Sequence, residues 1–507
     1  MAEELHFENS TVAGSANGEV PLEQRHPYAL SPTFQQSSHN PFATPPSLSR
    51  APSRGISVVS SQRTPLSGRQ TLHPCTQPAD PSPKTCFNLI AVAYTHGARR
   101  RKFKSSRLNP GEYDEKPWLQ DKVPRREWER IIFWAAIMLG FVIGGAICFL
   151  SWTNVMHGEF CLMHEDDFSA GIDGSTWNYE IQRGGFGTGS FEWTTDDPKN
   201  VFTDGEGLHI VPTLTTESTN ITLDDMYDKY VVNLTTDGTC THPCLDIDSC
   251  SIRSNKTAGT IINPVRSARL NTRGKKTIRY GKVEVVAKMP KGAWLWPAIW
   301  MMPDADVYGV WPRSGEIDIA ESRGNYGDEY PDGRDSVVSA LHWGPLPEAD
   351  GFYKTSGKHN VRRTDYTEQF HTYGLEWTED YLFTYLDTRL LQVFFIKFSH
   401  GYSSMWDRGH FGETKINKSA LFDPWSATGR ANTPFDQAFY LILNVAVGGT
   451  NGFFKDGVAD KPWVDASIHA PKEFFDAREL WRPTWPDDDN ERGMTVRRVK
   501  MWRQGKC

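Results

Sequence analysis

The stretch from Ile131 to Trp152 limits what this chain can fold into more than any other, because it contains no charged residue. About 20 consecutive apolar residues are enough for a helix to cross the hydrocarbon core of a bilayer. A buried helix of a soluble protein is the alternative, and the flanking charges argue against it. Basic residues precede the stretch, and between Thr153 and Ile172 there is no Lys or Arg. The positive-inside rule therefore predicts a single transmembrane helix with a cytosolic N-terminus.

This orientation divides the 507-residue chain into three zones. Residues 1–124 are rich in Ser, Pro, Gln and Thr, and are predicted to form a disordered cytosolic tail. Residues 131–152 form the helix, too far from the N-terminus for a cleaved signal peptide. Residues 160–507 form one folded domain, luminal or extracellular, so we expect a type II protein of the secretory pathway, plasma membrane or cell wall. The net charge of −7 gives no indication of nucleic-acid binding.

Sequons and cysteines agree with this location for residues 160–507. Four N-x-S/T triplets are candidate glycosylation sites: Asn220, Asn233, Asn255 and Asn417. Five cysteines lie in the same zone, where disulfides can form: Cys161, Cys240, Cys244, Cys250 and Cys507. A zinc site that uses the middle three cysteines with His242 fits no common motif. A disulfide loop is favoured, with Cys240 and Cys250 as the candidate pair, and the odd number leaves a thiol free or paired between chains.

Short strand patterns with Gly and Pro turns fill residues 160–507. Residues 280–288 alternate, with Val283, Val285 and Ala287 on one face. Residues 373–377 and 381–386 flank a polar turn and predict a hairpin, and residues 440–447 and 496–502 predict further strands. Long amphipathic helices are absent from the sequence pattern. These features predict an all-β fold, either a β-sandwich or a barrel.

Three carboxylates interrupt one apolar segment, Glu316-Ile317-Asp318-Ile319-Ala320-Glu321. Alternate side chains share one face of a strand, so Glu316 and Asp318 point to one side and the isoleucines to the other. A regular strand would turn Glu321 to the isoleucine side. One extra residue, most simply Ala320 in a β-bulge, returns Glu321 to the side of Asp318. We call Glu316, Asp318 and Glu321 the carboxylate row.

A row of this kind suits a retaining glycosidase. Such an enzyme places two carboxyl groups about 5–5.5 Å apart, where one attacks the sugar carbon and the other protonates the leaving oxygen. Crowded like charges raise carboxyl pKa values, which helps the acid keep its proton near neutral pH. A solvated edge strand with alternating acids is the alternative. The Gly, Pro and aromatic residues around the row, beginning with Gly315, disfavour it.

Motifs on both sides of the row resemble glycoside hydrolase family 16, the β-jelly-roll family of laminarinases. The matching segments are 280–285 (YGKVEV), 289–292 (MPKG), 294–300 (WLWPAIW), 311–315 (WPRSG), 341–343 (LHW), 370–377 (FHTYGLEW) and 444–449 (NVAVGG). The row with its extra residue is similar to the laminarinase branch, and residues 262–269 (INPVRSAR) resemble fungal wall enzymes. The resemblance covers nearly all of residues 160–507. It implies a concanavalin A-like jelly roll, as in lectins and glucanases, and a fungal type II membrane-anchored enzyme that remodels wall glucan.

The resemblance also implies a reaction and roles for the row. The expected substrate is β-1,3-linked or mixed-linkage glucan, which an endo-acting enzyme would hydrolyse or transfer to another sugar. Glu316 would be the nucleophile, and Asp318 would hold and tune it. Glu321 would be the acid, and then the base that activates water or an acceptor sugar. The sequence does not decide between these two acceptors, nor does it indicate an oligomeric state.

Other residues near the row are expected to bind substrate. Trp311 is expected under the reacting sugar, with core packing as the alternative. Trp296 and Trp343 either line neighbouring subsites or pack in the core. His342 would bond the sugar or an acid, and Arg313 would position a sugar hydroxyl or pair with a carboxylate. For Trp300 and Trp377, core packing is favoured.

One departure from the family pattern concerns calcium. Many members carry an Asp near the start of the last strand that helps to bind a structural calcium, and Arg497 stands at that position here. Calcium prefers oxygen ligands, which Arg does not supply. No metal and no cofactor are therefore predicted.

Two other functions remain open. The family includes recognition proteins that bind β-glucan and have lost the carboxylates, and the presence of all three acids here argues against that function. The cytosolic tail could also make the protein a structural anchor that binds sorting factors, which is compatible with catalysis.

Overall fold

The computed structural model describes residues 109–113, 115–120, 124–154, 158–242 and 246–507. The tail predicted to be disordered, residues 1–124, lies mostly outside these ranges, and so does Cys244. The chain divides into two compact units, whose described parts are residues 109–154 and residues 158–507.

The first unit is dominated by one long helix, α1 (Pro124–Asn154), which follows a short 3-10 turn, η1 (Pro117–Leu119). Within α1, residues 127–153 are long and apolar enough to cross a membrane, and none of the most apolar window is buried by protein. Its exposed side chains include Phe133, Trp134, Phe141 and Ile147. Length and composition thus agree with the predicted span. Insertion into a membrane stays a prediction.

The second unit is a sandwich of two eight-stranded sheets. The first sheet has the order β19-β18-β17-β12-β23-β5-β4, with β1 also on β23. Its strands are β1 (Phe160–Asp166), β4 (Val201–Asp204), β5 (Gly207–Ile210), β12 (Gly281–Lys288), β17 (His371–Trp377), β18 (Tyr381–Leu386), β19 (Gln392–Lys397) and β23 (Met494–Gln504). The strand pairs in this sheet are antiparallel.

The second sheet has the order β16-β15-β14-β13-β22-β10-β2, with β11 also on β22. Its strands are β2 (Asn178–Tyr179), β10 (Arg269–Asn271), β11 (Thr277–Ile278), β13 (Leu295–Pro303), β14 (Glu316–Glu321), β15 (Ser336–His342), β16 (Ser356–Asn360) and β22 (Phe439–Val447). Smaller sheets join β3 (Glu192–Thr194), β9 (Val265–Ser267) and β6 (Thr213–Leu214), then β7 (Val231–Asn233) and β8 (Ser251–Arg253), then β20 (Lys415–Ile416) and β21 (Ser419–Ala420).

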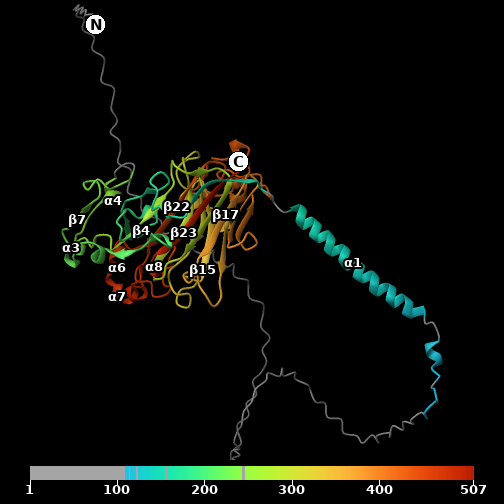
Figure 1. The fold of residues 1–507 in the computed structure, drawn as a ribbon. Helices are drawn as coiled ribbons and strands as arrows, with labels where there is room; N and C mark the ends of the chain where they lie inside the picture. Colours follow the sequence, from blue (N-terminus) through green and yellow to red (C-terminus); the bar gives the residue numbers. More distant parts are fainter. Residues whose placement is uncertain (1–108, 114, 121–123, 155–157, 243–245) are drawn as a thin grey trace, which may run out of the picture. The chain divides into compact units, whose positions relative to one another are not determined.

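Helices in this unit are short, and α3, α6 and α7 lie at one end of the sandwich (Figure 1). The α-helices are α2 (Thr215–Ser218), α3 (Leu223–Tyr227), α4 (Ile247–Cys250), α5 (Met405–Gly409), α6 (Ala470–Asp476), α7 (Arg478–Trp481) and α8 (Asp489–Arg492). The 3-10 turns are η2 (Gly185–Gly187), η3 (Pro347–Ala349), η4 (Phe352–Lys354), η5 (Ser426–Thr428) and η6 (Arg482–Thr484).

Side-chain patterning explains the two layers. Strand β12 alternates between buried and half-buried positions, with Val283, Val285 and Ala287 in the core. Strand β22 is buried along its whole length, which accounts for its continuous apolar sequence. The all-β sandwich predicted from the sequence is confirmed, including the hairpin of β17 and β18.

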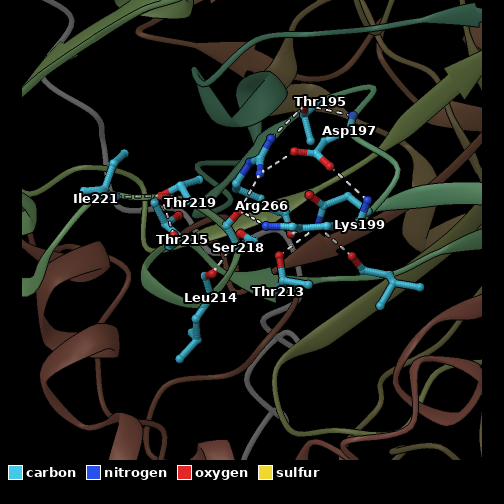
Figure 2. Close-up of polar contacts among 12 residues, drawn as sticks. Thr195, Asp197, Lys199, Thr213, Leu214, Thr215, Ser218, Thr219, Ile221 and Arg266 are labelled. Atoms are coloured by element: carbon cyan, nitrogen blue, oxygen red, sulfur yellow. Dashed lines mark hydrogen bonds and ion pairs between the residues drawn. The ribbon is translucent and has the colours of Figure 1, made fainter.

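A buried arginine joins the three-stranded sheet to the segment around α2. The Arg266 guanidinium donates to Asp197 Oδ2 at 3.0 Å, to Thr195 Oγ1 at 3.1 Å and to the Ser218 carbonyl at 3.4 Å. Lys199 Nζ donates to the same Ser218 carbonyl at 2.8 Å (Figure 2). The two cations therefore hold the C-terminal end of α2 against the three-stranded sheet.

Two disulfides bind the folded unit together. Cys240 pairs with Cys250, as the sequence favoured. The second bond, between Cys161 and Cys507, was not predicted, and it joins β1 to the residues after β23. Cys148 on α1 is exposed and forms no disulfide with another cysteine of the described residues.

Removal of the Cys161–Cys507 bond should destabilise the folded unit. This bond closes a loop with a sequence separation of 346 residues, and a disulfide stabilises partly by restricting the unfolded chain. We expect the double change Cys161→Ser, Cys507→Ser to lower the free energy of unfolding by about 2–4 kcal/mol. Denaturant titration of the full chain in detergent would measure it, with Cys148→Ser as the control. Equal midpoints for wild type and the double variant would contradict the prediction.

Candidate active site

A β-bulge aligns the carboxylate row on strand β14. Asp318 and Glu321 are three positions apart on β14, whereas their partners on β13 and on β15 are two positions apart. The bulge predicted from the sequence is therefore confirmed. The residue without a partner on β13 is Ile319, because Ala320 keeps one. The extra residue returns Glu321 to the face that Glu316 and Asp318 occupy.

A glycine sets the start of the row. Gly315 has φ +81°, a conformation that residues with a Cβ rarely adopt. A Cβ there would lie 3.0 Å from the Phe435 ring and 3.2 Å from Pro434. The turn before Glu316 therefore requires glycine and fixes where the strand begins.

Two indole groups hold the outer carboxylates of the row. Trp311 Nε1 donates to Glu316 Oε2 at 2.8 Å, and Trp296 Nε1 donates to Glu321 Oε1 at 2.9 Å. Trp311 keeps 38% of its surface exposed, so the expected contact with a sugar stays open to it. An indole N–H donates a hydrogen bond but carries no charge. Trp311 and Trp296 therefore orient the two carboxylates without adding a charge beside them.

A half-buried histidine lies beside the middle of the row. His342, at the end of β15, faces Glu316 across the strand pair. Its Nε2 is 3.3 Å from Asp318 Oδ2, an ion-pair contact without good hydrogen-bond geometry. Its Nδ1 is 2.5 Å from Asp350 Oδ2. The expectation that His342 bonds an acid is therefore met by Asp350, and Asp318 lies within ion-pair distance of the other ring nitrogen.

Burial and mutual repulsion raise the carboxyl pKa values of the row. Burial, then the charge of Asp318, raises the pKa of Glu316 to about 8. Burial, then the charge of Glu321, raises the pKa of Asp318 to about 6. Burial also raises the pKa of Glu321, against the charge of His342 and the bond from Trp296. Between about pH 6 and 8, Glu316 and Asp318 therefore share one proton and carry one negative charge.

Trp296 is supported by a stack rather than open to a sugar. Its ring lies 3.9 Å from that of Phe453 and is nearly parallel to it, and 8% of Trp296 is exposed. The Arg323 guanidinium covers Phe453 at 4.0 Å and donates to its carbonyl. Trp296 therefore reaches the site through its N–H, and its contribution as a sugar platform is small.

Trp343 is a correction to the expected substrate-binding residues. Its side chain is fully buried, and its Nε1 donates to Thr355 Oγ1 at 2.7 Å. It packs against Phe411 and Trp425, so it belongs to the core and cannot line a subsite. Trp377 is also fully buried, as the sequence favoured.

Trp300 is a second correction, because core packing was expected for it. It is half-buried on β13 and lies directly opposite Asp318, on the face of the row. Its Nε1 donates to Asn444 Oδ1 at 2.7 Å. The Arg269 guanidinium lies between the Trp300 ring, at 4.7 Å, and the Phe186 ring, at 4.1 Å. This stack extends the aromatic surface of the site across β13 and β10.

Arg313 links two loops beside the carboxylate row. Arg313 Nε donates to the Pro345 carbonyl at 2.7 Å, which ties the loop before β14 to the loop after β15.

Asn220, Asn255 and Asn417 are exposed and Asn233 is half-buried, so the predicted glycosylation sites lie at or near the surface.

Metal binding is geometrically possible at one place in the described part of the chain. Glu316, Asp318 and His342 each bring a ligand atom within 4.8 Å of the others. Burial lowers the pKa of His342, but Asp350, Asp318 and Glu316 outweigh it and hold that pKa well above its usual value. A metal would have to displace a proton from this imidazole, so the raised pKa disfavours metal binding at these three residues.

Asp350 and Phe453 are the residues near the site that sequence reasoning missed. Asp350 follows the LHW motif by a few positions, yet nothing local shows that its loop folds back on His342. Phe453 is far from Trp296 in the sequence, and its position depends on the path of the loop after β22.

Comparisons with known proteins identify the family of this chain. The chain matches the model of glycosyl hydrolases family 16 over residues 222–406, which include the carboxylate row. It is 38% identical over 354 residues to "Beta-1,3-glucan-binding protein" of Penaeus monodon, covering 68% of this chain and 90% of that protein. It is 29% identical over 339 residues to "Glucan endo-1,3-beta-glucosidase" of Cryptopygus antarcticus, covering 66% and 96%.

Among solved structures, the chain is similar to the laminarinase from Rhodothermus marinus, with 23% identity, a TM-score of 0.41, and 69% of this chain and 100% of that one covered. The family match, together with 38% identity over 90% of the Penaeus monodon protein, shows that this chain belongs to glycosyl hydrolases family 16.

Proposed function

We propose that residues 160–507 form a retaining endo-glycosidase for β-1,3-linked or mixed-linkage glucan, which hydrolyses the chain or transfers it to another sugar. The observation that carries the proposal is the carboxylate row itself. Glu316 and Glu321 share one strand face, each held by an indole N–H, with Asp318 between them. Two carboxyl groups on one face suit the nucleophile and the acid of this reaction. Family membership and the Cryptopygus antarcticus relative support glucan as the substrate.

The proposed reaction has two steps. In the first, Glu316 attacks the anomeric carbon, the bond to the leaving oxygen breaks, and Glu321 gives that oxygen its proton. In the second, Glu321 takes a proton from water or from an acceptor hydroxyl, whose oxygen attacks the same carbon and releases Glu316. Because Glu316 has the higher pKa of the pair, the shared proton must move from Glu316 to Asp318 before attack, so that Glu316 becomes the charged member.

The environment of the row supports these protonation states. Glu321 must be protonated at the start, and burial raises its pKa. Glu316 must be ionised, and the pair that it forms with Asp318 keeps one negative charge between about pH 6 and 8, which reaches Glu316 when the shared proton moves to Asp318. His342 lowers the pKa of all three carboxyls, which keeps the nucleophile available despite its burial.

Glucan binding without cleavage is the second candidate function. The Penaeus monodon relative is named as a binding protein, and it is 38% identical to this chain. The presence of Glu316, Asp318 and Glu321 together favours catalysis, because buried carboxylates are expensive to keep without a task.

We further propose that α1 anchors the enzyme in a membrane and that residues 160–507 lie on the luminal or extracellular side, near a glucan wall. The apolar composition of α1, the charge asymmetry around it and the two disulfides support this proposal. The wall of a fungal-type cell is inferred from the sequence motifs alone.

Substitution of the outer carboxylates tests the catalytic proposal. We expect Glu316→Gln to abolish turnover of a β-1,3-glucan, because the amide cannot form the covalent intermediate. We expect Glu321→Gln to lower kcat by about 10²–10⁴-fold, the usual contribution of a general acid. Product size and anomeric form, followed with the full chain in detergent, would measure both. Shorter β-products indicate retaining hydrolysis, and longer products indicate transfer.

Glu284→Gln is the matched control, since Glu284 lies on β12 in the other sheet. Equal activity of wild type and Glu316→Gln would refute the catalytic assignment. Tight binding with no turnover on β-1,3-, mixed-linkage or β-1,6-glucan would favour the binding function.

The pH dependence follows from the shared proton. Below about pH 6 both Glu316 and Asp318 are protonated, so the nucleophile is neutral. We expect kcat/KM to fall about tenfold for each pH unit below that point, because the ionised fraction falls in that ratio. Initial rates between pH 4 and pH 9 would show this acid limb. A rate that is constant from pH 4 to pH 6 would contradict the assignment.

Expression in a eukaryotic secretory system tests the orientation. The full chain should carry N-linked glycans, so treatment with an endoglycosidase should increase its gel mobility. Asn220→Gln, Asn255→Gln or Asn417→Gln should each remove one glycan and reduce that increase by one step. Deletion of residues 131–152 should leave the protein unglycosylated. A full chain without glycans, or glycosylation that survives the deletion, would oppose a signal-anchor role for α1.

A further inference from the structure

Asp350 is a buried acid that the proposed roles do not use. It lies between η3 and η4, and its side chain is 5% exposed. Its Oδ1 accepts hydrogen bonds from the backbone N–H groups of Trp343 and Phe352, both at 3.1 Å. Its Oδ2 lies 2.5 Å from His342 Nδ1. The backbone thus fixes one oxygen of Asp350, and this aims the other at the histidine.

His342 is held from three sides. Its ring stacks on Phe352 at 5.1 Å with an interplanar angle of 16°. One ring nitrogen faces Asp350, and the other faces Asp318 at 3.3 Å. A neutral imidazole carries one N–H and one lone pair, so it would turn a lone pair toward one of these carboxylates. Two carboxylate neighbours therefore select the imidazolium, which has a proton on each nitrogen.

We propose that Asp350 is a positioning residue that keeps His342 protonated and directed at Asp318, and so maintains a fixed positive charge beside the nucleophile. The inference deepens the proposed function and rests on it. The groups that face His342 are Glu316, Asp318 and Glu321 from β14 and Asp350 from the loop after β15. Without the imidazolium, Glu316 and Asp318 would keep their protons to higher pH, and the nucleophile would be neutral where it is now charged.

A merely structural role for Asp350 would be to cap its loop through the two backbone N–H groups. Asn keeps an oxygen that can accept from those groups, but it carries no charge to stabilise an imidazolium. Asp350→Asn therefore separates the two roles. A matched control is Asp423→Asn, because Asp423 also accepts from two backbone N–H groups, those of Trp425 and Ser426, and lies in another loop.

The first test is the pH profile of kcat/KM for the full chain in detergent with a β-1,3-glucan. An opposite charge within about 4–6 Å typically lowers a carboxyl pKa by about 1–3 units. We expect Asp350→Asn to move the acid limb up by about one pH unit or more, so that kcat/KM below the limb falls about tenfold and recovers at higher pH. Asp423→Asn should leave the limb in place. A loss of activity that is uniform across pH would show a structural role and overturn the proposal.

A second variant tests the inference if Asp350→Asn folds poorly. His342→Gln should shift the acid limb in the same direction, and the double variant with Asp350→Asn should shift it no further, because both remove the same charge. Additive shifts from the two changes would overturn the inference.

The second test does not depend on turnover. Histidine side-chain nitrogen resonances, with the His342 signal assigned by its loss in His342→Gln, would report the protonation of this ring. We expect an imidazolium in wild type at pH 7.5 and a neutral ring in Asp350→Asn. A neutral His342 in wild type would refute the inference even if the enzyme is active. A protonated ring in an inactive wild type would instead refute the proposed function and leave the charge arrangement standing.

Discussion

The need to keep negative charge in a buried strand governs this site. A lone buried carboxylate would take up a proton or destabilise the fold. Here Glu316, Asp318 and Glu321 lie together on β14, and burial raises the pKa of each. Indole N–H groups orient the outer two, and His342 lowers the pKa of all three. The elements around the row are those that supply these groups: the loop before β14, the start of β13 and the end of β15.

The two ends of the row are supported differently. At the Glu316 end, Trp311 is partly exposed and the loops are tied together by Arg313. At the Glu321 end, Trp296 is enclosed by Phe453 and Arg323. The donor to Glu321, the proposed acid, is thus more enclosed than the donor to Glu316, the proposed nucleophile. This difference suits the proposed roles, in which Glu321 exchanges a proton twice at one position and the Glu316 end admits the sugar.

Most of the fold and the centre of the site follow from local sequence rules, and the exceptions depend on long-range contacts. Alternation predicts β12, and the spacing of the acids predicts the bulge, because both depend on neighbours in the chain. Core packing was predicted wrongly for Trp300, and the sequence left Trp343 open between the core and a subsite, because only the sheet register and the packing of Trp343 against Phe411 and Trp425 decide. Asp350, Phe453 and the Cys161–Cys507 bond were missed because their partners are set by loop paths and by the closure of β1 on β23.

That closure has a consequence for the molecule as a whole. The Cys161–Cys507 bond links the first and last strands of the sandwich. It closes residues 161–507 into a covalent ring that contains the whole carboxylate row. A cut in the polypeptide anywhere inside that ring would leave both fragments attached to each other. A cut between α1 and Phe160 would instead separate the ring from α1 and leave the ring itself uncut. In the proposed membrane-anchored protein, one such cut would release the sandwich from the membrane without opening its fold.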